Sequence, residues 1–157
     1  MNPRVYVETT IPSYLTAWPS RDLIMAAHQQ VTLEWWDGRR HGFDLFISQF
    51  VIDEAALGDP DAAQRRLEIL IPLPILDASD DVFVVANELM KRVPLPAKAE
   101  TDSLHIAISA VNGMDYLMTW NCTHIANAEL RDDIEAVCRQ CGFEPPIICT
   151  PEELLTE

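Results

Sequence analysis

The chain has few cations. It contains 11 Lys and Arg residues against 25 Asp and Glu, which gives a formal net charge of -14. Proteins that bind nucleic acids gain affinity by neutralising phosphates, so this balance works against loose binding along a nucleic acid. Any nucleic-acid role must therefore rest on a local basic patch, on metal ions, or on both.

Long apolar segments and linkers are also missing. No stretch approaches the ~18 apolar residues of a membrane span, and Glu8 and Pro12 interrupt the only apolar run near the N-terminus. We therefore expect no signal peptide, no membrane partner and a cytoplasmic location. No internal repeat, low-complexity tract or Gly/Ser linker divides the sequence, so we expect a single domain over residues 1–157.

Cysteine is scarce as well. Four cysteines are few for a disulfide framework in a chain of this length. Cys138 and Cys141 form a C-x-x-C, but they fall on an apolar helical stripe with Leu130, Ile134 and Val137. No second pair of this kind completes a tetrahedral zinc site. We interpret these cysteines as thiols of the core.

What the sequence does contain is an alternation of short apolar runs with helical patterns. We expect strands at 4–8, 44–48, 72–76, 115–119 and 146–150, the third of them at an edge because it contains two prolines. Helices are expected after Ser20, Ser48, Asp59, Ser79 and Asn127, and over 100–112. This order predicts a three-layer α/β fold with a central, mostly parallel sheet of about five strands flanked by helices.

Four oxygen-bearing side chains are expected to gather at one edge of this sheet, where ligands of such folds bind. Glu8 ends the first strand, Glu54 lies on an apolar helix face, Asp102 opens a helix, and Asn121 follows a strand. Each alone has an ordinary explanation, such as a helix-dipole partner or a turn residue. Together they offer the ligands that Mg²⁺ or Mn²⁺ prefers.

Three segments resemble a known family. They are "VYVETTIPSYL" (5–15), "SQFVIDEAALGD" (48–59) and "ETDSLHIAISAVNGMDYLMTWNCTHIAN" (100–127). They look like the motifs of the PIN-domain nucleases, with Asp102, His105, Ala107, Thr119, Asn121 and His124 in register. By its size, the chain is most similar to the VapC-like toxins of bacterial toxin-antitoxin pairs.

The resemblance implies a Rossmann-like PIN fold and a metal-dependent endoribonuclease held by a cognate antitoxin. Carried over by position, Glu8, Glu54 and Asp102 would hold one Mg²⁺ or Mn²⁺, with a second ion left open. Asn121 would complete the catalytic set, where the family commonly has a fourth acid. Thr10 would orient the first acid or a metal-bound water, and Thr119 would support the site.

Several cations and aromatic residues extend this hypothesis. Lys98, Arg39 and Arg40 are candidates for the RNA backbone; Lys91 and Arg92 are further ones, although the helix dipole explains both.

The Trp35-Trp36 pair and Phe43 fit a homodimer or antitoxin surface, and core packing explains Trp35 equally well. His105 and His124 could tune the site, but a buried, hydrogen-bonded histidine is more common than a catalytic one.

Two functions remain open at this point. In the first, the chain hydrolyses RNA phosphodiester bonds as the toxin of a toxin-antitoxin pair. In the second, the Glu at position 8 and the Asn at position 121 leave a catalytically weak or inactive PIN-fold module that binds RNA or a protein partner.

Overall fold

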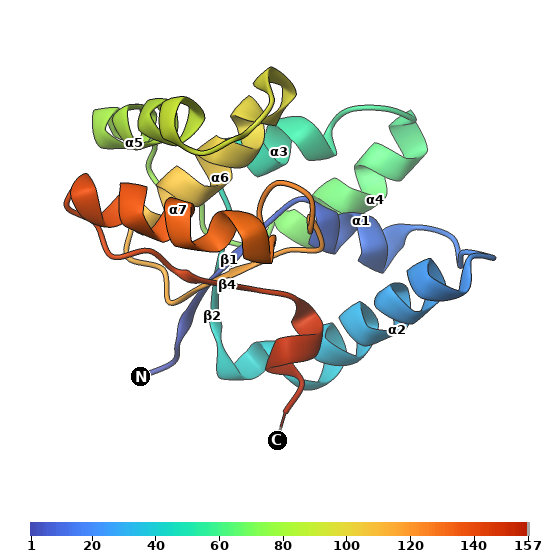
Figure 1. Cartoon of the computed structure of the whole chain (residues 1–157). Coiled ribbons are helices and arrows are strands. Elements are labelled where there is room, and N and C mark those ends of the chain that lie inside the picture. Colours follow the sequence, from blue (N-terminus) through green and yellow to red (C-terminus); the bar gives the residue numbers. More distant parts are fainter. Residues whose placement is uncertain (157) are drawn as a thin grey trace.

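The computed structural model describes residues 1–156 and shows a parallel sheet with helices on both sides (Figure 1). The strands are β1 (Arg4–Val7), β2 (Asp44–Phe46), β3 (Tyr116–Met118) and β4 (Ile147–Cys149). The helices are α1 (Thr10–Thr16), α2 (Leu23–Gly38), α3 (Gln49–Ala55), α4 (Pro60–Leu70), α5 (Asp80–Arg92), α6 (Glu100–Val111) and α7 (Ala128–Gln140). Three short 3-10 helices are η1 (Arg40–Gly42), η2 (Ala97–Ala99) and η3 (Pro151–Leu154). In Figure 1, α5, α6 and α7 lie on one side of the sheet and α2 on the other.

The predicted α/β class with a parallel sheet is confirmed, but the prediction of about five strands was wrong. The sheet has four strands in the order β2-β1-β3-β4, and every neighbouring pair is parallel. Residues 72–76 do not form the fifth strand and contribute only a single bridge between Ile47 and Ile75. Pro72 and Pro74 have no N–H to donate, so a regular ladder cannot continue there.

The central strand β1 is buried on both faces. Val5, Tyr6 and Val7 are all 0% exposed, which fits a strand covered by helices on each side. From β1 the chain passes to β2 on one side, whereas from β3 it passes to β4 on the other. The crevice between the carboxyl ends of β1 and β3 is therefore the switch point at which ligands of such sheets bind.

Most of the predicted helix starts are confirmed by their caps. The side chains of Ser48, Asp59 and Asn127 each accept a hydrogen bond from a backbone N–H of the first turn that follows. The predicted start after Ser20 was wrong by two residues, because Asp22 caps α2. The Ser20 hydroxyl instead accepts from the backbone N–H of Asp22.

Helix α1 was not expected from the sequence. It begins two residues after Glu8 and contains Pro12 at its third position. A proline is tolerated in a first turn, since the N–H groups there have no partner within the helix. This helix turns the chain away from the sheet directly after the predicted site.

The interpretation of the C-x-x-C as core thiols holds for Cys138, which is buried, and Cys141 lies half-buried beside it. All four cysteines are free. Burial raises the pKa of the Cys138 thiol to about 12 and that of Cys149 to about 12, so both stay protonated at neutral pH. Thiolate chemistry at these positions is disfavoured.

The remaining sequence expectations concern the core and the membrane. Trp35 is fully buried and packs against Phe43, so core packing accounts for it. Across residues 1–156, no helix has the length and apolar character needed to cross a membrane.

Candidate metal centre at the carboxyl edge of the sheet

Glu8 directly follows β1, and its side chain is buried. The residue is 3% exposed. Its Oε1 atom accepts hydrogen bonds from the Thr10 backbone N–H at 3.0 Å, from the Thr10 hydroxyl, and from the Thr119 hydroxyl at 2.7 Å. Three donors thus compensate one oxygen of the carboxylate, as a buried charge requires.

Thr10 and Thr119 hold Glu8 in matching ways. The backbone N–H of Trp120 donates to Thr10 Oγ1 at 2.8 Å, and that of Asn121 donates to Thr119 Oγ1 at 2.9 Å. An ionised carboxylate only accepts hydrogen bonds, so both hydroxyl protons are directed at Glu8. The two threonines therefore tie the end of β1 to the loop after β3.

Glu54 lies in the last turn of α3 and meets α6. Its Oε1 accepts a hydrogen bond from Thr9 Oγ1 at 2.6 Å and lies 2.6 Å from His105 Nε2, within hydrogen-bond distance. Partial burial raises the pKa of the Glu54 carboxyl, but its interactions with His105 and the hydrogen bond from Thr9 outweigh this effect. The net pKa lies below its ordinary value of 4.5, so Glu54 is ionised at neutral pH.

A buried polar chain runs behind Glu54. The Tyr6 hydroxyl lies 2.6 Å from His105 Nδ1 and 2.6 Å from Ser48 Oγ, and all three residues are fully buried. Burial raises the pKa of the Tyr6 phenol well above its ordinary value; the hydrogen bond with Ser48 opposes this, and the charges of Glu8 and Glu54 add to it. Tyr6 therefore keeps its proton and can donate it.

Glu8, Glu54 and His105 each bring one ligand atom to within 4.8 Å of the others. Over residues 1–156, no hydrogen bond reaches Oε2 of Glu8 or Oε2 of Glu54. Carboxylates this close repel each other unless a cation lies near. Two such oxygens without a protein partner are ligands of the kind that hard divalent cations take. The cluster could therefore hold a metal ion.

Asp102, the third predicted ligand, borders this cluster instead of joining it. It lies on α6 three residues before His105, on the same helix face. Its Oδ2 accepts a hydrogen bond from His124 Nδ1 at 2.9 Å. In the part of the chain that the structure describes, its Oδ1 accepts none. The structure thus brings together two of the three predicted carboxylates, and the third lies on α6 about one turn before His105.

Asn121 holds the loop after β3. Its Oδ1 accepts from the backbone N–H of His124 at 3.0 Å, and its carbonyl accepts from that of Ala126 at 2.8 Å. The side chain makes no hydrogen bond to Glu8 or Glu54 among the described residues. Its contacts are those of an Asn that closes a turn.

The predicted RNA-backbone cations lie in different places. Lys98 is exposed in η2, immediately before α6. Arg39 and Arg40 precede β2 and so lie at the amino edge of the sheet, opposite Glu8. Arg39 donates to the Leu154 carbonyl, and the guanidinium of Arg40 covers Trp36. These two arginines therefore lie away from Glu8, and their expected contact with the RNA backbone stays a prediction.

The other two candidate cations lie at the end of α5. Lys91 and Arg92 pair with Glu88 at 3.9 Å and 4.0 Å. Both pairs are of the i,i+3 or i,i+4 kind within one helix. These contacts fit the helix-dipole explanation better than an RNA contact.

The sequence did not single out two arginines of α4, a helix that packs against α1 and α3. The Arg65 guanidinium lies 5.3 Å from the Trp18 ring centroid. Arg66 donates to the carbonyls of Ala55 and Leu57 at the end of α3. No sequence motif marks these arginines. The packing of α4 brings them beside α1, which follows Glu8, and beside α3, which carries Glu54.

An aromatic stack supports the loop after β3 and was also missed. The rings of His28 and Trp120 lie 4.0 Å apart with an interplanar angle of 13°, and Tyr14 lies parallel to Trp120 at 6.0 Å. Trp120 Nε1 donates to Thr32 Oγ1 at 2.7 Å. The stack joins α1, α2 and the loop that carries Thr119 and its neighbours.

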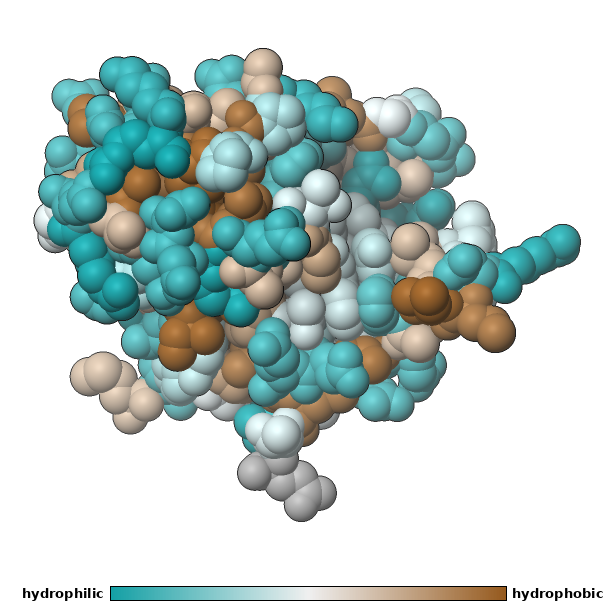
Figure 2. Space-filling view, viewed as in Figure 1, coloured by the Kyte–Doolittle hydropathy of each residue, from teal (hydrophilic) through white to brown (hydrophobic). Residues whose placement is uncertain are grey.

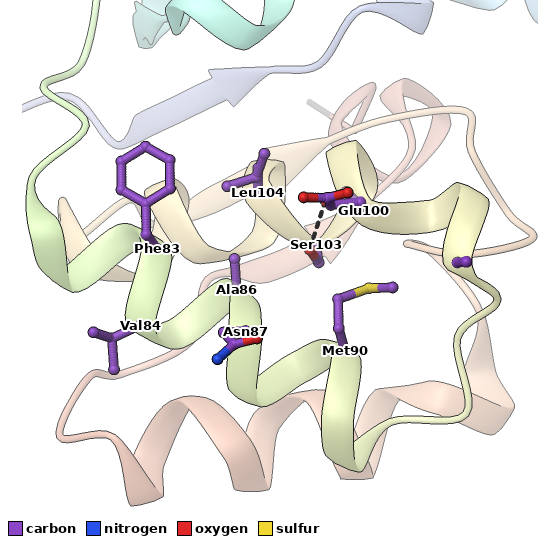
Figure 3. A pocket seen from close by; sticks show the side chains of 9 residues that line it. Phe83, Val84, Ala86, Asn87, Met90, Glu100, Ser103 and Leu104 are labelled. Carbon is purple, nitrogen blue, oxygen red and sulfur yellow. Dashed lines mark hydrogen bonds between the residues drawn. The ribbon is translucent and has the colours of Figure 1, made fainter.

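Hydrophobic surface groups lie away from the cluster. Figure 2 shows brown side chains over the start of α2, where Leu23 and Ile24 are exposed. A cavity of about 620 Å³ lies between α5 and α6, and Figure 3 shows side chains that line it. Its lining is Phe83, Val84, Ala86, Asn87, Met90, Ala97, Glu100, Ser103 and Leu104. Glu8, Glu54 and His105 do not line this cavity, and Glu100 is the one ionisable residue among the described residues that do.

Comparison with models of known protein families gave no match, and comparison with curated proteins gave none either. The resemblance to the PIN-domain nucleases therefore stays a prediction from the sequence.

Proposed function

We propose that the chain is a metal-dependent endoribonuclease of the PIN type, and the toxin of a toxin-antitoxin pair. The observation that carries this proposal is the arrangement of Glu8 and Glu54 at the switch point. Each carboxylate is held by protein donors through Oε1, while Oε2 has no protein partner among residues 1–156. Such a pair is prepared to bind a cation on one side.

Mg²⁺ or Mn²⁺ suits this set of donors. Glu8 and Glu54 would hold the ion, and Asp102 would take part from the border of the cluster through its oxygen without a partner. A bound divalent ion supplies a more acidic water and stabilises charge on a phosphate. The residues of the chain fix where the ion binds: Thr10 and Thr119 orient Glu8, and Thr9 and His105 orient Glu54.

Few basic side chains are available to contact RNA at this edge of the sheet. Lys98 before α6 and Arg65 on α4 are the better-placed candidates for backbone contacts, given that Arg39 and Arg40 lie at the opposite edge. With a net charge of -14, the chain would bind RNA weakly without the metal. An arginine-bearing segment of an antitoxin would complement the same acidic edge.

Cleavage of an RNA panel tests the proposal. We expect Mn²⁺-dependent cleavage by the wild type and a loss of at least ~100-fold in Asp102→Asn, since removing one charged group from a site of this kind has effects of that order. Asp133→Asn is the matched control, because it makes the same change at an exposed position of α7. It should cleave like the wild type.

The alternative of a silent binding module predicts another result. Wild type and Asp102→Asn would then be equally inert, while RNA or a protein partner would still bind. That outcome would contradict the proposal that the chain is an enzyme.

A further inference from the structure

Of the three clustered side chains, His105 brings a ring nitrogen, and its neighbours determine its chemical role. Its Nε2 lies 2.6 Å from Glu54 Oε1, and its Nδ1 lies 2.6 Å from the Tyr6 hydroxyl. The ring is 0% exposed, so no water competes for either nitrogen at the surface. Both nitrogens must therefore be satisfied by these two contacts.

The contact with Glu54 fixes which nitrogen carries a proton. An ionised carboxylate cannot donate, so a hydrogen bond at 2.6 Å requires a proton on Nε2. A bare Nε2 lone pair at that distance would face the carboxylate oxygen without a proton between them. Nε2 is therefore a donor to Glu54 while Glu54 is ionised.

The hydrogen bonds of Ser48, at the other end of the buried chain, determine which group donates in the contact between Tyr6 and His105 Nδ1. Ser48 Oγ accepts from the Val51 backbone N–H at 3.3 Å, as a helix cap, and its own proton has only the Tyr6 oxygen to go to among the described residues. The Tyr6 hydroxyl then donates to His105 Nδ1. Ser48, Tyr6, His105 and Glu54 form one directed chain in which both hydroxyl protons and the Nε2 proton have an acceptor.

The reverse direction leaves a buried group unpaired. If Nδ1 donated to Tyr6, the Tyr6 proton would go to Ser48, and the Ser48 hydroxyl proton would have no acceptor among the described residues. A buried donor without an acceptor is costly, so the first direction is favoured.

We propose that His105 is a positioning residue, which donates from Nε2 to Glu54 Oε1, and that it does not ligate the metal. The ion then meets only oxygen ligands, at the Oε2 sides of Glu8 and Glu54. The statement that His105 does not ligate the ion rests on the proposed metal site. The statement that His105 donates to Glu54 concerns the metal-free protein alone.

Nitrogen NMR of the metal-free protein tests the donor role. Long-range ¹H–¹⁵N spectra distinguish a protonated from an unprotonated ring nitrogen, and resonances are assigned with His105→Gln. We expect a proton on Nε2 and an unprotonated Nδ1. A proton on Nδ1 with a bare Nε2 would overturn the proposal.

Spin-echo spectroscopy of bound Mn²⁺ tests the ligand set. A coordinated imidazole gives a ¹⁴N coupling, which we expect to be absent from the wild type. A ¹⁴N coupling that persists in His41→Gln but vanishes in His105→Gln would show that His105 is a ligand. His41 is the matched control, because it is exposed in η1 at the opposite edge of the sheet.

Mn²⁺ affinity separates positioning from ligation in a third way. Glutamine can donate from its amide to Glu54, so His105→Gln should keep the affinity within about 3-fold. His105→Leu, which has no donor, should lose about 10–100-fold, as loss of a group that orients a ligand does. Equal losses in both variants, with thermal midpoints showing that both fold, would overturn the positioning role.

Tyr6→Phe offers a variant that keeps the ring in the core. It removes the donor to Nδ1 but leaves Nε2 on Glu54, so we expect the Nε2 proton to persist and the affinity for Mn²⁺ to fall less than in His105→Leu. Failure of the wild type to bind Mn²⁺ would count against the proposed function, whereas the NMR result in metal-free protein would still decide the donor role.

Discussion

Glu8 and Glu54 each use one oxygen for hydrogen bonds to the protein, and the other oxygen has no partner among residues 1–156. Hydrogen bonds to a charged group contribute about 1.5–3 kcal/mol each, so three donors at Glu8 and two at Glu54 offset much of the cost of burying charge. All five donors reach Oε1. At the scale of the residue, this asymmetry would suit each carboxylate to a cation, in contrast to a buried acid whose two oxygens are both paired.

The lowered pKa of Glu54 predicts a pH dependence. A carboxyl whose pKa is lower in the folded protein contributes stability above its ordinary value of 4.5 and loses it as pH falls through the folded value. We therefore expect the wild type to exceed Glu54→Gln in free energy of unfolding at pH 7, by less than about 1 kcal/mol because the side chain is partly exposed. The difference should shrink as pH falls below 4.5 and through the lowered pKa of Glu54, as followed by urea unfolding without metal.

The control for this prediction removes a charge elsewhere. Asp133→Asn, at an exposed position of α7, accounts for the general effect of one less negative charge. Curves for wild type and Glu54→Gln that stay parallel from pH 3 to 7 would contradict the pKa assigned to Glu54.

At the scale of the element, α3 is set in place at both ends by one network. Ser48 caps its first turn, and Glu54 in its last turn is hydrogen-bonded to His105 of α6. Tyr6 on β1 connects the two, so a strand and two helices share a single chain of hydrogen bonds. The orientation of the Glu54 carboxylate is thus coupled to the cap of its own helix.

This coupling predicts that two helix caps of the same kind differ in importance. Asp59→Ala removes an exposed cap from α4 and should cost about 1 kcal/mol. Ser48→Ala removes a cap and also leaves the buried Tyr6 oxygen without its donor, which adds about 1–3 kcal/mol. Urea unfolding of the two variants measures the difference.

One result of these unfolding measurements would contradict the predicted difference between the two caps. Equal losses in Asp59→Ala and Ser48→Ala would mean that Ser48 acts as a cap alone. The buried chain would then carry little energy.

The strands and most caps were predictable because they depend on local chemistry. Apolar runs bounded by Gly, Pro and cap residues mark β1, β2, β3 and β4 in the sequence. The prediction of a fifth strand was wrong because it relied on an apolar pattern. Two prolines in that segment have no backbone N–H to donate to a neighbouring strand. Helix α1 was missed because Pro12 stands inside it, at a position where a first turn tolerates proline.

The candidate site was predictable only in part. Glu8 and Glu54 could be expected to meet, because both follow strands whose carboxyl ends share an edge. The role of His105 depends on Tyr6 and Ser48, which come from two other elements, and no spacing in the sequence shows which ring nitrogen faces which partner. Arg39 and Arg40 were assigned by charge alone, and the fold places them at the other edge.

At the scale of the whole molecule, the dominant property is charge. A net charge of -14 destabilises the compact state by repulsion, which salt screens over about 10 Å at 0.1 M. Any divalent ion also screens, so an effect of Mg²⁺ or Mn²⁺ on stability is meaningful only against a background of matched ionic strength.

Thermal unfolding at constant ionic strength gives the corresponding prediction. Sodium chloride alone should raise the midpoint of wild type and Glu54→Gln alike. Replacing part of it with Mn²⁺ at about ten times the dissociation constant should raise the wild type further, by about 1.4 kcal/mol or roughly 3–6 °C, through binding to the folded state. Glu54→Gln should gain less than half of this. An equal gain in both would place the ion elsewhere.

The central position of β1 has a consequence for synthesis of the chain. Thr119, one of the hydroxyl donors to Glu8, lies 111 residues later in the sequence, and β1 needs β3 as a neighbour. During translation, β1 must therefore wait unpaired on one edge until β3 has been made. The pocket around Glu8 cannot assemble before Thr119 has left the ribosome, so any activity that it supports begins only after that point.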